Sequence, residues 1–219
     1  MFSILLASVG TLTYSAPMLD PIAYRDMIEV PSEVRWDTES DSSFQRVLNK
    51  DKPFSNLYYE PRDLAEITSD FTANNSRAFK LRREAWMQFA DMAWHFWNQS
   101  NGTKKFSINT AYRSYSEQKY LMQWYCVGKV WQCANPWASE HQAWLALDLW
   151  VNNRSIDQAS LEWLRNNAHK WWFHNTYQKG VEVDGQIAEP WHWRYVWVDL
   201  ATLLHDEGLT LAEWYRKNS

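Results

Sequence analysis

Two short stretches of the sequence, SEHQAWLALD at residues 139–148 and EPWH at residues 189–192, decide how the rest of the chain is interpreted. Together they supply two histidines and one aspartate, His141, Asp148 and His192. Two imidazoles and a carboxylate can bind zinc while a fourth position stays open for water. We therefore predict a zinc site with these three residues as ligands.

A carboxylate that is not a ligand is needed to take a proton from that water. Glu189 lies three residues before His192 and is the predicted general base. Glu140 is a second candidate for this role. We expect its side chain to point away from the site, because it neighbours His141 and successive side chains of an extended backbone face opposite ways.

Alternating patterns around these stretches predict the strands that carry the site. Residues 145–149, LALDL, are typical of a buried strand that turns Asp148 toward the site and its leucines to the other side. Residues 193–198 predict another strand, and residues 106–110 predict one that leads into Arg113. An arginine there can hold a carboxylate or an oxyanion through its fork of donors, so Arg113 is a candidate catalytic residue.

The spacing of apolar residues predicts a helix over residues 77–97. N-terminal capping signals predict three more helices, starting at Ser116 and ending near residue 125, starting at Ser155 and ending at residue 170, and starting at Thr210. Helices in both halves with short strands between them indicate an α+β fold. We expect a small, mainly antiparallel sheet flanked by helices, with the zinc site in a cleft on the sheet.

Three segments, in the order expected for the family, resemble the VanY-type D-alanyl-D-alanine carboxypeptidases, zinc peptidases that trim the stem peptides of bacterial peptidoglycan. They are AYRSYSEQ at residues 111–118, similar to the family's Y-R-S-x-x-x-Q, then S-x-H-(x6)-D at 139–148 and E-P-W-H at 189–192. The similarity extends from about residue 48 to residue 215. The HExxH helix of other zinc peptidases is absent from the sequence.

The resemblance implies a zinc-dependent hydrolase that releases the terminal D-Ala of a peptidoglycan stem peptide. Arg113 would hold the substrate, with further hydrogen bonds from Ser139 and Gln118. An L,D-carboxypeptidase and a D-Ala-D-Ala dipeptidase are alternatives on the same scaffold. From another class, the chain could be a catalytically dead peptidoglycan-binding module whose cleft is plugged by Trp137 and Trp144.

The 219 residues predict one catalytic domain over residues 48–219, preceded by a signal-like segment and a linker or arm over residues 1–47. The apolar residues 1–16 favour export, either to the cell envelope or as a secreted protein, although a basic start is missing. A net charge of −4 without a basic stripe argues against nucleic acid as a partner. No stable protein partner is implied.

The only cysteines are Cys126 and Cys133, and they lack the further ligands nearby that a structural zinc site with four ligands would need. In an exported protein they favour a local disulfide that braces the rim of the cleft. A pair of thiols is the alternative for a cytoplasmic protein.

The chain has 16 tryptophans but 6 glycines, whereas glycine usually makes up about 7% of a protein. Several tryptophans stand where the resembled family has glycine: Trp137, Trp144, Trp172, Trp197 and Trp150. Some bacteria read the codon UGA as glycine and others read it as tryptophan, so translation with the wrong table would produce this pattern. The first four should then occupy tight turns, positive-φ positions or crowded backbone, with their indoles turned outward or into the cleft.

Overall fold

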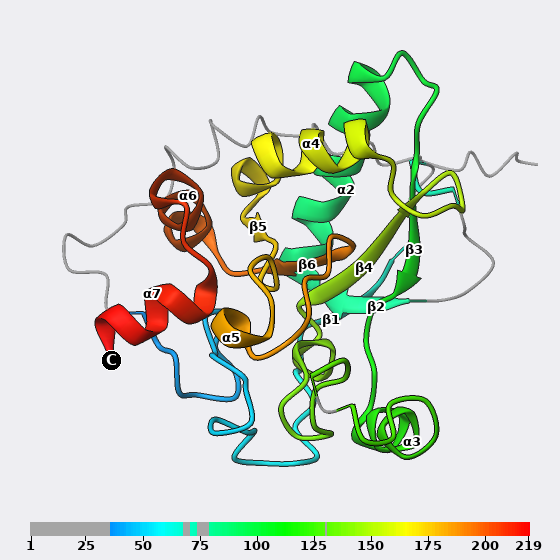
Figure 1. Cartoon of the computed structure of the whole chain (residues 1–219). Helices are drawn as coiled ribbons and strands as arrows, with labels where there is room; N and C mark the ends of the chain where they lie inside the picture. The colour runs from blue at the N-terminus through cyan, green and yellow to red at the C-terminus, as the bar shows by residue number, and fades with distance from the viewer. Residues whose placement is uncertain (1–35, 68–70, 74–78, 130) are drawn as a thin grey trace, which may run out of the picture.

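The computed structural model describes residues 36–67, 71–73, 79–129 and 131–219, so the signal-like segment lies outside the described residues. Its centre is a four-stranded antiparallel sheet in the order β3-β4-β6-β5 (Figure 1). These strands are β3 (Phe106–Thr110), β4 (Ala146–Val151), β6 (His192–Tyr195) and β5 (Phe173–His174). A separate two-stranded sheet pairs β1 (Leu64–Glu66) with β2 (Lys80–Arg82).

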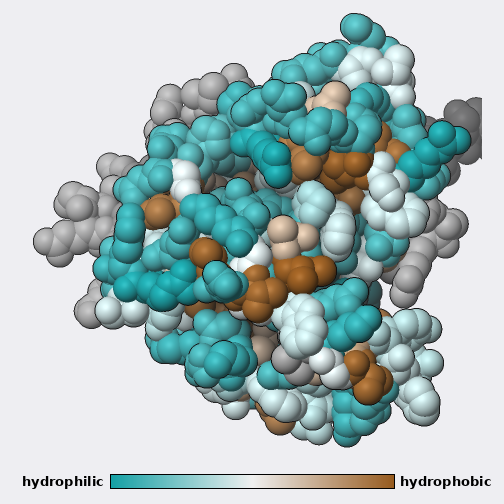
Figure 2. All heavy atoms as spheres, in the orientation of Figure 1, coloured by the Kyte–Doolittle hydropathy of each residue, from teal (hydrophilic) through white to brown (hydrophobic). Residues whose placement is uncertain are grey.

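Helices flank the sheet, which confirms the α+β class. They are α2 (Arg83–Gln99), α3 (Tyr115–Trp124), α4 (Gln158–Asn167), α5 (Val181–Asp184), α6 (Val198–Glu207) and α7 (Leu211–Asn218). The apolar side of α2 packs against β3, where Phe96 stacks on Phe106 with ring centroids 4.2 Å apart. Figure 1 shows α3 at the end of the molecule away from α4. The face in Figure 2 is mostly hydrophilic, because the core takes most of the large apolar side chains.

Several element boundaries differ from the sequence-based predictions. The helix expected from residue 77 begins at Arg83, because Lys80–Arg82 pairs as a strand with a segment that the local pattern cannot reveal. The helix expected to be capped by Ser116 is capped by Ser114, whose side chain accepts a hydrogen bond from the backbone of Glu117. The capping box predicted at Thr210, with Glu213, is confirmed.

Two further predictions were wrong in detail. The helix expected to be capped by Ser155 has Asp157 as its N-cap. It ends at Asn167 and is followed by a short 3₁₀ helix, η2 (Ala168–Trp171). The strand expected to reach residue 198 ends at Tyr195, because α6 begins only three residues later.

The predicted disulfide between Cys126 and Cys133 is present, with the two Cα atoms 6.1 Å apart. Cys133 lines the cavity that contains the predicted zinc ligands. The bridge therefore closes a loop at the rim of this cavity, as expected.

Residues 36–47, called the N-terminal arm below, form no helix or strand but pack against the domain. Trp36 meets Trp214 of α7 edge to face at 5.2 Å, and Phe44 meets Tyr195 of β6 in the same way at 5.4 Å. Val47 is buried. The domain boundary at residue 48 stays a prediction.

Among the described residues, positive φ outside glycine occurs at three asparagines and at three of the suspected tryptophans. Trp144 has φ 62°, Trp172 has φ 66° and Trp197 has φ 73°. The fourth, Trp137, lies in a turn without positive φ and is half-buried. For the three with positive φ, the expectation that the indoles point outward or into the cleft was wrong. Trp144 and Trp172 are buried, and each of the three indoles packs against an aromatic neighbour. Trp144 stacks on Tyr112, Trp172 contacts Tyr195, and Trp197 stacks on Phe44. Trp150 has ordinary strand backbone.

Candidate metal centre

Two of the predicted zinc ligands face each other across neighbouring strands. Asp148 in β4 is the register partner of His192 in β6, so the sheet itself brings the two side chains together. The leucines beside Asp148 are buried on the other side, as the alternating pattern predicted. His141 comes from a 3₁₀ helix, η1 (Glu140–Ala143), which is separated from β4 by two residues.

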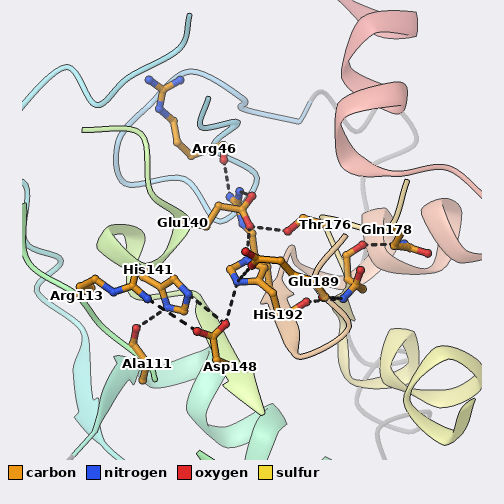
Figure 3. Close-up of polar contacts among 12 residues, drawn as sticks. Arg46, Ala111, Arg113, Glu140, His141, Asp148, Thr176, Gln178, Glu189 and His192 are labelled. Carbon is orange, nitrogen blue, oxygen red and sulfur yellow. Dashed lines mark hydrogen bonds and ion pairs between the residues drawn. The ribbon is translucent and has the colours of Figure 1, made fainter. Parts of the chain in front are cut away.

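Hydrogen bonds decide which nitrogen of each imidazole faces the centre (Figure 3). Nδ1 of His141 lies 2.6 Å from the carbonyl oxygen of Ala111 and donates to it, so Nε2 faces Asp148. In His192 the roles are exchanged, because Nε2 lies 2.9 Å from a carboxylate oxygen of Glu140 and Nδ1 faces Asp148. The nitrogen of each imidazole that faces away from the centre is thus held by a hydrogen bond, as in many metal-binding histidines.

The distances from Asp148 to the two imidazole nitrogens fit a tetrahedral ion. Oδ1 of Asp148 lies 3.3 Å from Nε2 of His141 and 3.2 Å from Nδ1 of His192. Bonds of about 2.0–2.1 Å in tetrahedral geometry place neighbouring ligand atoms about 3.3 Å apart. The three residues are buried, and the three donor atoms, one from each residue, lie within 4.8 Å of one another. This donor set could hold zinc and leave one position for water or substrate.

Glu140 does not point away from the site, so that expectation was wrong. It lies in a 3₁₀ turn rather than on extended backbone, and three residues per turn place neighbouring side chains about 120° apart. Its carboxylate accepts hydrogen bonds from His192, from Thr176 at 2.6 Å and from Arg194 at 2.6 Å. Burial alone would raise the pKa of Glu140, but Arg194 and His192 outweigh it and lower this pKa to about 2. Glu140 therefore lies as a carboxylate behind a ligand.

Glu189 lies on the cavity side of the same cluster. Its Oε2 is 3.9 Å from Nδ1 of His192, beyond hydrogen-bond distance. The side-chain amide of Asn175 holds the turn by donating to the carbonyl oxygens of both residues, at 2.7 and 2.8 Å. Burial raises the pKa of Glu189 to about 7, although His192 acts in the opposite direction. A carboxylate with such a pKa can both accept and release a proton near neutral pH.

Arg113 reaches the centre from the loop after β3. Its Nη2 lies 3.8 Å from Oδ2 of Asp148, and its Nη1 donates to Oε1 of Gln118 at 2.6 Å. Gln118 is fully buried, and its amide nitrogen donates to the carbonyl oxygen of Ala134. The amide of Gln118 therefore orients Arg113, while its predicted contact with substrate stays a prediction. Ser139 is buried beside the same cavity.

All seven predicted site residues line one cavity of about 250 Å³. They are Arg113, Gln118, Ser139, His141, Asp148, Glu189 and His192. The suspected plugs, Trp137 and Trp144, are not among the residues that line it. The indole of Trp144 instead stacks on Tyr112, so the structure contradicts the plugged cleft.

Besides Asn175, the residues around this centre that were not predicted from the sequence include Thr176, Tyr177, Gln186 and Arg194. Tyr177 lies with its ring 4.7 Å from that of His192, and Gln186 lines the cavity. Arg194 carried a signal, because it follows His192 by two residues and a strand places both on one face. The other four lie on irregular backbone, where no periodic pattern points to them.

A small antiparallel sheet with a buried His-Asp-His cluster and a nearby carboxylate defines a class of metal-dependent hydrolase sites. The family model of VanY, D-alanyl-D-alanine carboxypeptidase, matches residues 78–198. The chain belongs to this family.

Two curated relatives agree with this assignment. A D-alanyl-D-alanine carboxypeptidase of Enterococcus faecalis (strain ATCC 700802 / V583) is 36% identical over 83 residues, 37% of this chain and 31% of the relative. YodJ of Bacillus subtilis (strain 168), which is named as a carboxypeptidase, is 29% identical over 174 residues, 73% of this chain and 62% of the relative. The chain thus spans less than two thirds of the length of either relative.

Solved structures share the fold. The LdcB LD-carboxypeptidase superposes with a TM-score of 0.71 at 26% identity, over 82% of this chain and 88% of that chain. A vancomycin-resistance D,D-pentapeptidase VanY variant in complex with Zn(II) has a TM-score of 0.64 at 22% identity, over 77% and 97% of the two chains.

Proposed function

We propose that this protein is a zinc-dependent carboxypeptidase that releases the terminal D-Ala from peptidoglycan stem peptides. The observation that carries the proposal is the convergence of His141, Asp148 and His192 on one point at the wall of a cavity that also contains Glu189 and Arg113. Zinc, when bound there, would supply an activated water molecule and polarise the scissile carbonyl. The related VanY structure in complex with Zn(II) supports the choice of metal.

Glu189 is the general base of this proposal. It is not needed as a ligand, it lies beside the ligand His192, and burial raises its pKa to about 7. Its carboxylate would accept the proton of the attacking water and pass it to the leaving amine.

Arg113 would bind the free carboxylate at the end of the substrate. Gln118 occupies Nη1, which leaves the remaining donors of the guanidinium to reach into the cavity. A planar fork suits a carboxylate because it can donate two parallel hydrogen bonds. Ser139 would add a hydrogen bond to the bound peptide.

A second candidate is L,D-carboxypeptidase activity, favoured by the similarity to LdcB, which has the higher TM-score of the two structures compared. The two activities differ in the residue that precedes the scissile bond. The site residues identified above are compatible with both.

Release of D-Ala from a stem pentapeptide and from a tetrapeptide, with and without a chelator, tests the proposal. We expect release from the pentapeptide, loss with the chelator and recovery on addition of zinc. Release from the tetrapeptide alone would favour the second candidate. Activity that withstands complete removal of metal would contradict both.

The proposed substrate places the protein in the cell envelope. Among the described residues, no helix is long and apolar enough to cross a membrane. Detection of the protein in fractionated cells would test this location.

A further inference from the structure

A path of buried hydrogen bonds leads from the metal ligand His192 to the N-terminal arm (Figure 3). Nε2 of His192 donates to one oxygen of Glu140 at 2.9 Å, and Nη1 of Arg194 donates to the other at 2.6 Å. Nη2 of Arg194 then donates to the backbone carbonyl oxygens of Arg46 and, at 3.3 Å, Phe44. Because the side chains of His192, Glu140 and Arg194 are 2%, 2% and 0% exposed, water does not compete along this path.

Arg194 depends on the arm for its position. Its guanidinium is completely buried, and its Nε has no hydrogen-bond partner among the described residues. Glu140 and the two arm carbonyls therefore provide the hydrogen bonds that this buried cation requires. If the carbonyls moved away, Nη2 would lose both acceptors, and the ion pair with Glu140 would rearrange or admit water.

The arm has no regular structure, so side-chain contacts decide where its carbonyls lie. The side chain of Arg46 is 3% exposed, and its guanidinium donates to the carbonyl oxygen of Thr38 at 3.0 Å and lies 3.6 Å from the carboxylate of Asp41. Because Thr38 and Asp41 belong to the arm, Arg46 fixes the path of the arm itself. Its Nη2 also donates to the carbonyl oxygen of Pro53, outside the arm, at 2.5 Å. Phe44 packs beneath the guanidinium of Arg82, 3.8 Å from its ring centroid. Phe44 thus contacts β2 through Arg82 and β6 through Tyr195, so residues 44–46 are held against both strands.

We infer that the N-terminal arm is a positioning element of the metal site, acting through Arg194 and Glu140 on the imidazole of His192. This inference rests on the proposed function in that His192 is taken as a metal ligand. The arm then belongs to the catalytic unit, although it lies outside the domain boundary predicted at residue 48. Loosening the arm weakens metal binding without changing any ligand.

The test measures zinc affinity of the full chain by competition with a chromophoric chelator. Arg46→Met removes the guanidinium whose contacts hold the arm in place. Glu140→Gln replaces the carboxylate that connects His192 to Arg194 by a neutral amide. Lys52→Met is the matched control, because it also removes one positive charge and one ion pair with the arm, to Glu39 at 2.7 Å, but that pair is exposed and off the path. We expect Arg46→Met and Glu140→Gln to weaken zinc binding by roughly 10–100-fold, as for other residues that support metal ligands. Lys52→Met should stay close to the unaltered chain.

A double variant separates positioning from general loss of stability. If Arg46 and Glu140 act along one path, Arg46→Met should weaken zinc binding much less in the Glu140→Gln background than in the unaltered chain. Unfolding temperatures of the metal-free variants show that each remains folded in the assay.

Unchanged affinity in folded Arg46→Met, or independent effects in the double variant, would overturn the inference. The assay contains no substrate, so a chain that binds zinc in this way but hydrolyses nothing contradicts the proposed function alone. A chain that binds no zinc contradicts both.

Discussion

Replacing Trp197 by glycine and, separately, by alanine tests whether its backbone is suited to glycine. The residue has φ 73° and ψ 169°, a combination used almost only by glycine. Both variants remove the indole and its stacking on Phe44, so they differ only in one methyl group. Comparison with tryptophan itself would be less informative, because loss of a large side chain has a cost of its own.

The expected difference follows from two opposing effects. A residue other than glycine in this region costs about 1–3 kcal/mol. Greater freedom of the unfolded chain makes glycine less stable than alanine by about 0.5–1 kcal/mol in regular structure. The glycine variant should therefore be the more stable by about 1–2 kcal/mol, or roughly 2–8 °C in the melting temperature of a domain of this size.

Thermal unfolding followed by circular dichroism measures this difference at fixed metal concentration. At Trp144 and Trp172, which have φ of 62° and 66°, the glycine variant is likewise expected to be more stable than the alanine variant. Trp150 is the control, since it is half-buried like Trp197 but lies on ordinary strand backbone in β4, where alanine should be the more stable. An alanine variant at residue 197 as stable as the glycine variant would refute the reasoning.

The gene tests the proposed origin of these residues. We expect UGA at the codons for Trp144, Trp172, Trp197 and Trp137, and UGG for Trp191, which matches a tryptophan of the family's E-P-W-H. UGG at the first four would end the coding explanation, whatever the stability measurements show.

Three further predictions concern the site and its rim. Glu189→Ala should keep zinc binding near normal but lower kcat by about 10²–10⁴-fold, because the proton acceptor is lost. Glu182→Ala, at an exposed glutamate, is the control, and normal turnover of Glu189→Ala would contradict the mechanism. Arg113→Lys should raise KM for a peptide with a free C-terminal carboxylate, because the planar guanidinium is lost. Equal cleavage of this peptide and its C-terminal amide by the unaltered chain would argue against binding of the carboxylate by Arg113. Reduction of the bridge between Cys126 and Cys133 should lower the free energy of unfolding by about 2–3 kcal/mol, and an unchanged urea midpoint would contradict that stabilisation.

Local patterns in the sequence predicted the part of the site that regular structure carries. Alternation in residues 145–149 correctly placed Asp148 opposite the leucines, because a strand has a period of two. The capping box at Thr210 was also readable, since both of its partners lie within one turn. The residues themselves and the resemblance to the family supplied the predicted ligand set.

The rest depends on contacts between distant segments. Strand β2 exists because residues 80–82 pair with residues 64–66, and helical spacing nearby concealed it. Glu140 was misplaced because its turn is 3₁₀ rather than extended. The arm has no periodic pattern, and Phe44 meets Tyr195 only after the chain has folded.

The three proposed ligands lie on different kinds of secondary structure. Asp148 and His192 belong to paired strands, whereas His141 lies on a 3₁₀ turn that ends at the positive-φ position 144. A substitution at position 144 would thus shift one ligand while the sheet preserves the distance between the other two. Variation at this single turn offers evolution, or an engineer, a way to retune the preferred ion while leaving the scaffold intact.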